Sequence, residues 1–305
     1  MLETINEAAG RIRRLEVQGA RNVAIAAVVA LQMGAKQSSA QNKTEFLSEL
    51  SEAQKILFAA RETEPLMRNA VRWITNQVKI SKEEKTIQLT QVVSVSADKF
   101  LSDLDASRET IAEIGSKRIC DGMTVFTHCH SSTATRLLAK AKEEGKNFKV
   151  ICTETRPAFQ GRITAREMVE LGVETTFIVD SAARSFMRSV DLVIVGADAI
   201  TSEGNVVNKI GTSGIAVLAN EARKPFYVVS ELLKFDPETL HGEAEKIEQR
   251  SPDEIWKEAP AKLHLRNPAF DVTPRKYIHG LICEEGIIPT QSIVEVMKRK
   301  YPWVF

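Results

Sequence analysis

The spacing of apolar residues divides the chain into two parts, and the first part is predicted to be helical. From Glu3 to about Lys117, apolar residues recur every three or four positions, as in AIAAVVALQM and LMRNAVRWITNQV, which is the period of an amphipathic helix. One proline, Pro65, interrupts this part, and a helix seldom continues through the residue before a proline. We therefore predict an N-terminal helical domain over residues 1–118.

The second part begins after Asp121 and Gly122 and shows short apolar runs in place of the helical period. MTVFTHC, FKVICTE, DLVIVGAD and PFYVVSE are typical of buried strands, and helical stretches such as STATRLLAKAKEEG lie between them. This alternation predicts an α/β fold, with a Rossmann-like, doubly wound parallel sheet as the catalytic domain over residues 119–305. Such a sheet binds ligands at the carboxyl ends of its strands, so we look for the chemistry there.

Composition limits the partners that we expect. Of 305 residues, 43% are hydrophobic and 27% are charged, which is enough apolar material for a buried core. The formal net charge is only +1, so no bulk field recruits nucleic acid or an anionic membrane, and we expect neither as a partner. An anionic ligand would have to be bound by local groups.

Cysteine usage and the N-terminal segment predict a cytoplasmic protein. The four cysteines are far apart and form no CxxC pair, which argues against a disulfide framework and against a structural zinc site. The N-terminal segment is amphipathic and charged, and no window approaches the length and apolarity of a membrane span.

The stretch VFTHCHSSTATRL places Cys129 between His128 and His130. Successive side chains of a strand point to opposite faces, so a metal shared by all three residues is awkward. A cysteine at a strand end is often only a small buried hydrophobic residue. Here SSTATRLL is expected to open a helix, whose N-terminal dipole would lower the pKa of the thiol and favour a reactive thiolate.

Asp198 ends the apolar run DLVIVGAD and is the second candidate for chemistry. Poor solvation after this run would raise the pKa of its carboxyl group and allow it to deliver a proton, and the alternative is a helix cap or a loop salt bridge. Cys129 and Asp198 both follow predicted neighbouring strands, so we expect them to face one another across a pocket.

Several segments are candidates for anion binding. In NVVNKIGTSGIA, Asn208 and Lys209 precede a predicted helix start at residues 211–214, whose free amides suit a phosphate. In ETRPAFQGR, Gln160 lies between two arginines that could equally form a surface salt bridge. Arg21 and Arg61 lie in the helical part, where a lone arginine is more often a solvated charge.

Taken together, THCHSS, TETRPAFQGRITA, VIVGADAITSEGNVVNKIGT, PFYVVSE and NPAFDVTP resemble one superfamily. It joins sugar-phosphate isomerases to the regulatory subunits of the eukaryotic initiation-factor nucleotide exchanger. Within it, the chain is most similar to the archaeal ribose-1,5-bisphosphate isomerases. The resemblance implies that Cys129 is the proton acceptor and Asp198 the proton donor in forming ribulose 1,5-bisphosphate, a step of archaeal nucleotide salvage that needs no metal or other cofactor.

The resemblance also implies contacts to the sugar bisphosphate, and we add Gln160 as an anion-binding candidate. The residues that match substrate contacts are Gly19, Ala20, Arg21, Asn22, Arg61, Ser131, Ser132, Asn208, Lys209 and Lys234. The chain departs from the family at Gln18, where an arginine is usual, and at Glu62, where a proline is commonly expected. The family pattern further implies a homo-oligomer, either a dimer or a trimer of dimers, and a nucleotide as activator.

Two other functions fit parts of this pattern. A methylthioribose-1-phosphate isomerase would share Cys129 and Asp198, but would need an apolar pocket in place of a second phosphate site. More cationic residues are present than one phosphate needs, which favours the bisphosphate; they are Arg21, Arg61, Lys209 and Lys234. A non-catalytic regulatory subunit that binds an initiation factor would, as a rule, lack the pairing of cysteine and aspartate.

Overall fold

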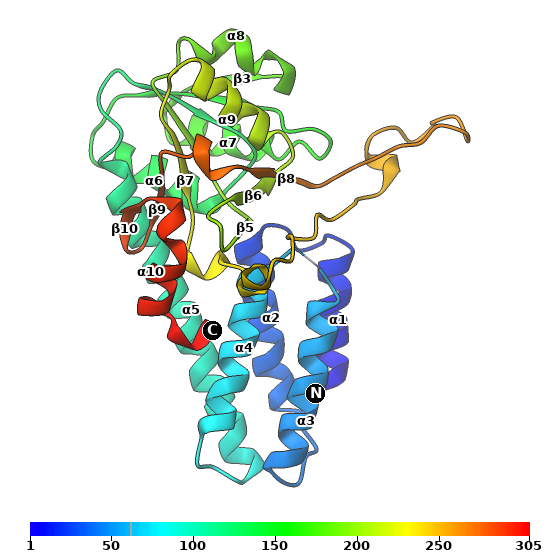
Figure 1. Cartoon of the computed structure of the whole chain (residues 1–305). Coiled ribbons are helices and arrows are strands. Elements are labelled where there is room, and N and C mark those ends of the chain that lie inside the picture. The colour runs from blue at the N-terminus through cyan, green and yellow to red at the C-terminus, as the bar shows by residue number, and fades with distance from the viewer. Residues whose placement is uncertain (62) are drawn as a thin grey trace. The chain divides into compact units, whose positions relative to one another are not determined.

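A computed structural model describes residues 1–61 and 63–305, which form two compact units (Figure 1). The helical unit contains Met1–Ala106 and Lys298–Phe305, and the sheet unit contains Ser107–Met297. The sequence pattern changes only after residue 118 because a single long helix continues across the division at Ala106. The fold class predicted from the sequence, a helical part followed by a mostly parallel sheet, is confirmed.

The helical unit is built from amphipathic helices. They are α1 (Leu2–Arg13), α2 (Ala20–Ala35), α3 (Lys43–Phe58), α4 (Pro65–Ile80) and most of α5 (Thr86–Ser116), together with the end of α10 (Ile293–Lys300) and η7 (Pro302–Val304). Pro65 is the first residue of α4, where a missing backbone N–H leaves no helical hydrogen bond unmade. Fully buried residues such as Ile5, Phe46 and Ile74 form the core of this unit.

The sheet unit contains a seven-stranded sheet in the order β10-β9-β7-β4-β1-β2-β3. Its strands are β1 (Thr124–Thr127), β2 (Lys149–Thr153), β3 (Glu174–Ile178), β4 (Leu192–Val195), β7 (Phe226–Val229), β9 (Gly280–Cys283) and β10 (Gly286–Ile288). All pairs are parallel except β9 with β10. Besides the end of α5 and the start of α10, its helices are α6 (Ser132–Glu143), α7 (Gly161–Glu170), α8 (Ala183–Met187) and α9 (Thr212–Glu221). Its 3-10 turns include η1 (Asp180–Ala182), η2 (Leu232–Lys234), η5 (Arg275–Tyr277) and η6 (Thr290–Ser292).

The central strands are apolar on both faces because helices cover the sheet. Every residue of β4 is buried, and β1 and β2 each expose only their first residues. Val125, Cys152 and Ile194 lie in one buried cluster that also includes Leu137 of α6 and Met168 of α7. The continuous apolar runs in the sequence therefore correspond to strands of a buried parallel sheet.

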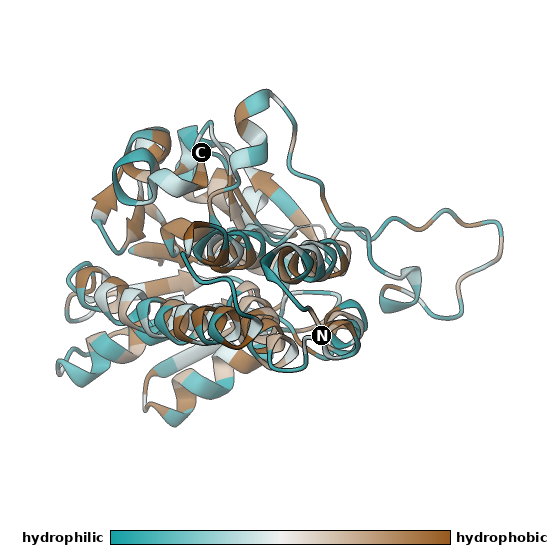
Figure 2. Cartoon of the chain, turned by 90° about the horizontal axis from the view of Figure 1, so that it is seen from below, coloured by the Kyte–Doolittle hydropathy of each residue, from teal (hydrophilic) through white to brown (hydrophobic). Residues whose placement is uncertain are grey.

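A second, antiparallel sheet joins β5 (Ala199–Ile200), β6 (Val206–Lys209) and β8 (Phe270–Thr273). The segment between β7 and β8 is mostly irregular and contains η3 (Pro237–His241) and η4 (Pro252–Glu254). Figures 1 and 2 show the later part of this segment extending away from β8 as a largely hydrophilic loop. Within the described residues, no helix has the length and apolar character needed to cross a membrane.

Candidate active site

Three neighbouring strands end at the candidate site. β1 lies between β2 and β4 in the sheet, and all three run parallel, so their carboxyl ends lie at the same edge. Cys129 follows β1 and Asp198 follows β4. The β1 and β4 loops pack tightly, because a Cβ at Gly196 would lie 2.6 Å from the Cβ and Oγ of Ser131. The predicted neighbourhood of the two strand ends is therefore present in the structure.

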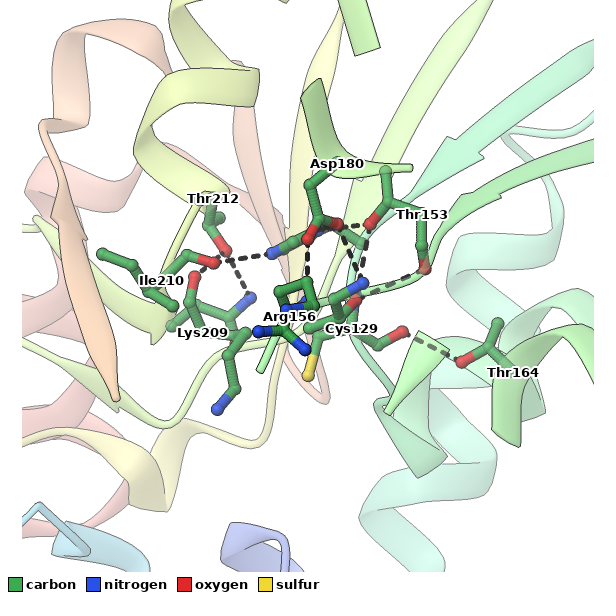
Figure 3. Close-up of polar contacts among 12 residues, drawn as sticks. Cys129, Thr153, Arg156, Thr164, Asp180, Lys209, Ile210 and Thr212 are labelled. Carbon is green, nitrogen blue, oxygen red and sulfur yellow. Dashed lines mark hydrogen bonds and ion pairs between the residues drawn. The ribbon is translucent and has the colours of Figure 1, made fainter. Parts of the chain in front are cut away.

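Cys129 lies at the sharp turn between β1 and α6. Its φ of 68° is in the left-handed region, which residues other than glycine rarely adopt. Its N–H donates to Thr155 Oγ1 at 2.9 Å, and its carbonyl oxygen accepts from Thr164 Oγ1 at 2.9 Å. In Figure 3 the Cys129 sulfur and the Lys209 ammonium group are directed to the same side of the strand ends.

Burial controls the acidity of the Cys129 thiol. It raises the pKa of Cys129 from 9.0 to about 11, with the nearby positive charge of Lys209 acting in the opposite direction and the carboxylate of Asp198 adding to the rise. The predicted lowering of the thiol pKa by the start of α6 was therefore wrong. Desolvation of the sulfur outweighs the local positive charges, so the resting group is a neutral thiol at pH 7.

The histidines on either side of Cys129 bind to neighbouring elements. His128 is buried, with Nε2 2.9 Å from the Ile210 carbonyl oxygen and Nδ1 2.6 Å from Thr153 Oγ1. Because a carbonyl only accepts, Nε2 carries the hydrogen and the Thr153 hydroxyl donates to Nδ1. Burial lowers the pKa of His128, which favours this neutral form and a fixed link between the ends of β1 and β6.

His130 contacts the threonine that also binds the Cys129 backbone. Its Nδ1 is 3.2 Å from Thr164 Oγ1, and burial lowers its pKa. Among the described residues, no three His, Cys, Asp or Glu side chains form a group able to hold a metal ion. Both histidines bind neighbouring elements of the turn, and the expectation that they do not share a metal with the thiol stays a prediction.

Asp198 follows β4, and the ammonium group of Lys234 binds the carbonyl oxygen of the residue before it. The Asp198 side chain is half-buried, and its backbone N–H donates to the Val207 carbonyl oxygen at 2.9 Å. The Lys234 ammonium group donates to the Ala197 carbonyl oxygen at 2.8 Å and lies 3.2 Å from Glu231 Oε2. The charge of Lys234 is thus held beside Asp198, and its contact to substrate stays a prediction.

The other predicted contacts in the sheet unit occupy defined places. Asn208 donates to Thr212 Oγ1 at 2.9 Å, and Lys209 lies over the Phe270 ring, with its ammonium nitrogen 5.5 Å from the ring centroid. Ser131 caps α6 by accepting from the Ala134 N–H at 3.3 Å, and Ser132 is the first residue of that helix. Gln160 precedes α7, and its Oε1 is buried without a hydrogen-bond partner among the described residues.

The start of α9 is filled by a carboxylate that the sequence did not single out. Asp271 on β8 accepts from the Gly211 N–H at 2.8 Å and from the Ser213 N–H at 3.0 Å, and burial raises its pKa to about 6. The predicted phosphate site at these amides was therefore wrong. The sequence did not indicate this contact, because Asp271 lies about 60 residues after the Gly211 amide. The pairing of β6 with β8 brings the two groups together.

The predicted contacts in the helical unit are described within that unit alone. Gly19 precedes α2 with a φ of 83°, Ala20 is buried, and Asn22 donates to the Gln18 carbonyl oxygen at 3.0 Å. Arg21 donates to the Leu104 carbonyl oxygen and pairs with Asp105, and Arg61 pairs with Glu64 at 2.9 Å. The departure noted at Glu62 lies outside the described residues. Contact of these groups with substrate stays a prediction.

Arg250 is a further charge at the site that sequence reasoning missed. Its side chain is only 5% exposed and lies 3.2 Å from Glu248, and its positive charge, like that of Lys209, opposes the rise in the Cys129 pKa. It belongs to the irregular segment before β8, where neither a periodic pattern nor a motif marks it. Only the folded chain brings this arginine near the thiol.

The chain is similar to known proteins over most of its length. Residues 16–290 match the initiation factor 2 subunit family. The chain is 41% identical to a ribose 1,5-bisphosphate isomerase of Thermococcus kodakarensis, covering 99% of this chain and 96% of the relative. It is 44% identical to the enzyme of that name from Archaeoglobus fulgidus, with coverage of 98% and 94%.

Two further matches show how widely this fold is used. A methylthioribose-1-phosphate isomerase of Acetivibrio thermocellus is 36% identical, covering 94% of this chain and 89% of the relative. The solved structure of a translation initiation factor eIF-2B from Pyrococcus horikoshii has a TM-score of 0.81 at 30% identity, covering 93% of this chain and 96% of that one. The fold therefore occurs both in isomerases and in a protein named as an initiation factor.

Proposed function

The chain belongs to the initiation factor 2 subunit family, and we propose that it is an isomerase that converts ribose 1,5-bisphosphate into ribulose 1,5-bisphosphate. Six relatives that carry the name ribose 1,5-bisphosphate isomerase are 36–44% identical to it over nearly the whole chain. The observation that carries the proposal is the meeting of Cys129 and Asp198 at the ends of adjacent parallel strands.

Isomerisation of this sugar needs an acid and a base. The C1 oxygen carries a phosphate, so the ring cannot open to a free aldehyde in the ordinary way. We assign Cys129, as thiolate, to remove the proton from C2, and Asp198, as carboxylic acid, to protonate the ring oxygen while the bond between C1 and that oxygen breaks. The product of this step is an enol across C1 and C2.

The second half of the reaction restores both groups. The Cys129 thiol returns its proton to C1, and the Asp198 carboxylate takes the proton of the C2 hydroxyl as that carbon becomes a carbonyl. No atom is gained or lost overall. Because the pKa of Cys129 is raised, its thiolate is scarce at pH 7 but strongly basic, and the positive charge of Lys209 favours its formation.

The phosphates would supply the energy that positions the sugar. We assign Ser131, Ser132, Gln160, Asn208 and Lys209 to substrate binding in the sheet unit. Lys234 joins them through its place beside Asp198. By family resemblance we also assign substrate contacts in the helical unit to Gly19, Ala20, Arg21, Asn22 and Arg61. The same resemblance leads us to propose a homo-oligomer that responds to a nucleotide activator. We further propose that it acts in nucleotide salvage in the cytoplasm.

Methylthioribose 1-phosphate is the alternative substrate, favoured by a relative of that activity at 36% identity. It has one phosphate and an apolar thioether where the bisphosphate has a second dianion. A purely regulatory role is less well supported, because it would need neither the thiol nor the carboxyl group at the strand ends. The two isomerase functions differ in one group of the substrate, so direct competition separates them.

Turnover of the two sugars by the purified chain tests the proposal. We expect kcat/KM for ribose 1,5-bisphosphate to exceed that for methylthioribose 1-phosphate by at least about a hundredfold, because the thioether offers no negative charge or hydrogen-bond acceptor where the bisphosphate has its second phosphate. Products are identified by phosphorus and carbon NMR. A preference for the methylthio sugar would establish the alternative, and turnover of neither would exclude both isomerase functions.

A further inference from the structure

The backbone at Cys129 has a conformation that needs support from its surroundings. With a φ of 68°, Cys129 is a cysteine in the left-handed region, where a Cβ is crowded. Thr155, which binds it, has a φ of 62°. Residues held in such conformations persist only where neighbouring groups determine them, and they concentrate at functional sites.

Two threonine hydroxyls bind the two backbone groups of Cys129. Thr155 Oγ1 accepts from the Cys129 N–H at 2.9 Å, and Thr164 Oγ1 donates to the Cys129 carbonyl oxygen at 2.9 Å. Thr155 and Thr164 are 0% and 1% exposed. Cys129 lies between β1 and α6, so neither element supplies partners for its backbone N–H and carbonyl groups. The two threonine hydroxyls supply these hydrogen bonds instead.

Both threonines are themselves fixed to the sheet. The Thr155 N–H donates to Asp180 Oδ1 at 2.8 Å, at the start of η1. Thr164 lies in the first turn of α7, which approaches β2 closely because Gly161 has no Cβ; one built there would lie 1.7 Å from the Thr153 carbonyl oxygen. Figure 3 shows the bond from Thr164 to the Cys129 carbonyl on one side of the turn.

From this geometry we infer that Thr155 and Thr164 are positioning residues, which hold Cys129 in its left-handed conformation and so aim its sulfur at the substrate. The inference rests on the proposed role of Cys129 as the base. The φ and ψ angles of a residue set the direction of its Cα–Cβ bond, so relaxation to extended backbone would carry the sulfur away. Proton transfer depends on that alignment.

Paired substitutions separate the hydroxyl from the rest of the side chain. Thr155→Val and Thr164→Val remove the hydroxyl at nearly constant volume, whereas Thr155→Ser and Thr164→Ser retain it. We expect each valine variant to lower kcat by on the order of ten- to a hundredfold with little change in KM, as for a misplaced catalytic group. The serine variants should stay within about threefold of the parent.

Thr175→Val is the matched control. Among the described residues, the hydroxyl of Thr175, which lies on β3, binds only the carbonyl oxygen of Val173, just before that strand. It should leave kcat and KM unchanged. Valine variants that fold and keep the kcat of the parent would overturn the inference. Should neither valine variant fold, the serine variants decide: a folded serine variant that loses activity tenfold shows that the hydroxyl is not the required group.

Alkylation of Cys129 by iodoacetamide gives a readout that does not depend on turnover. It is measured against pH in a Cys120→Ser background, because Cys120 is exposed whereas Cys152 and Cys283 are buried. A released turn exposes the sulfur, so the valine variants should alkylate several-fold faster at pH 8 while they isomerise more slowly. Valine variants with the alkylation profile of the parent contradict the inference. This result is readable even if the parent does not isomerise ribose 1,5-bisphosphate, so it separates failure of the positioning role from failure of the proposed function.

Discussion

At the residue scale, Cys129 shows what a sequence can and cannot say about a reactive group. Its place at a strand end before a helix identifies it as a candidate without any structure. The direction of its pKa shift could not be predicted, because the desolvation of the thiol and the nearby charges of Lys209 and Asp198 arise only in the folded chain. Local helix chemistry favoured the thiolate, and desolvation in the folded chain favoured the thiol.

The raised pKa of Cys129 predicts an unusual pH dependence. The folded protein favours the neutral thiol more than the unfolded chain does, so the raised pKa contributes to the free energy of unfolding. This contribution is complete below the ordinary pKa of 9.0 and is lost as pH rises through about 11. The rate of alkylation of Cys129 should accordingly keep rising beyond pH 9 and level off near 11. Stopped-flow alkylation in the Cys120→Ser background measures this profile.

Replacement of Lys209 tests how far its positive charge sets the pH at which Cys129 becomes reactive. Since its positive charge lowers the Cys129 pKa, Lys209→Gln should move the midpoint higher and slow alkylation at pH 8 by about three- to tenfold. Lys149→Gln, at the amino end of β2, is the control and should change nothing. A parent midpoint near the ordinary pKa of 9.0 would show that burial does not control the thiol, and a midpoint that is insensitive to Lys209→Gln would show that the charge of Lys209 does not act on it.

At the element scale, most strands of the seven-stranded sheet were predicted from their apolar runs, whereas the strands of the second sheet were not predicted. The runs around Val125, Val150 and Val193 form β1, β2 and β4, and the STATRLLAKAKEEG stretch forms α6. β5, β6 and β8 were missed because none has a continuous apolar run: β5 has two residues, β6 and β8 mix apolar with polar residues, and the pairing of β6 with β8 joins segments distant in the chain. The same pairing places Asp271 at the start of α9.

Close contact between α7 and β2 makes Gly161 a sensitive position. A Cβ at Gly161 would lie 1.7 Å from the Thr153 carbonyl oxygen, and backbone atoms would have to shift. We expect Gly161→Ala to lower the free energy of unfolding by about 2–3 kcal/mol, measured by urea denaturation. Gly214→Ala in α9 is the control: its Cβ meets nothing within 4 Å, so stability should rise by up to about 1 kcal/mol. Equal effects at both positions would contradict this account of the contact.

At the scale of the whole molecule, the fold class and the family resemblance were both readable from the sequence. Motifs distributed from Cys129 to Asp271 in one order carry information that no single motif does. Within the sheet unit, the structure brings the predicted pair Cys129 and Asp198 to adjacent strand ends. For Arg21 and Arg61 the resemblance implied substrate contacts, which stay a prediction, and each has a carboxylate partner inside the helical unit.

The central claim is that Cys129 removes the C2 proton of ribose 1,5-bisphosphate with Asp198 as the acid. It is tested most directly by following loss of deuterium from the C2 position of labelled substrate, together with calorimetric binding. The parent should lose deuterium from C2 during turnover, with the label passing to C1 of the product or exchanging with solvent. Cys129→Ser and Asp198→Asn should bind substrate but lose the C2 label about a thousandfold more slowly, as expected when one proton-transfer group is lost. Loss of the C2 label by Cys129→Ser at the parent's rate would contradict the account.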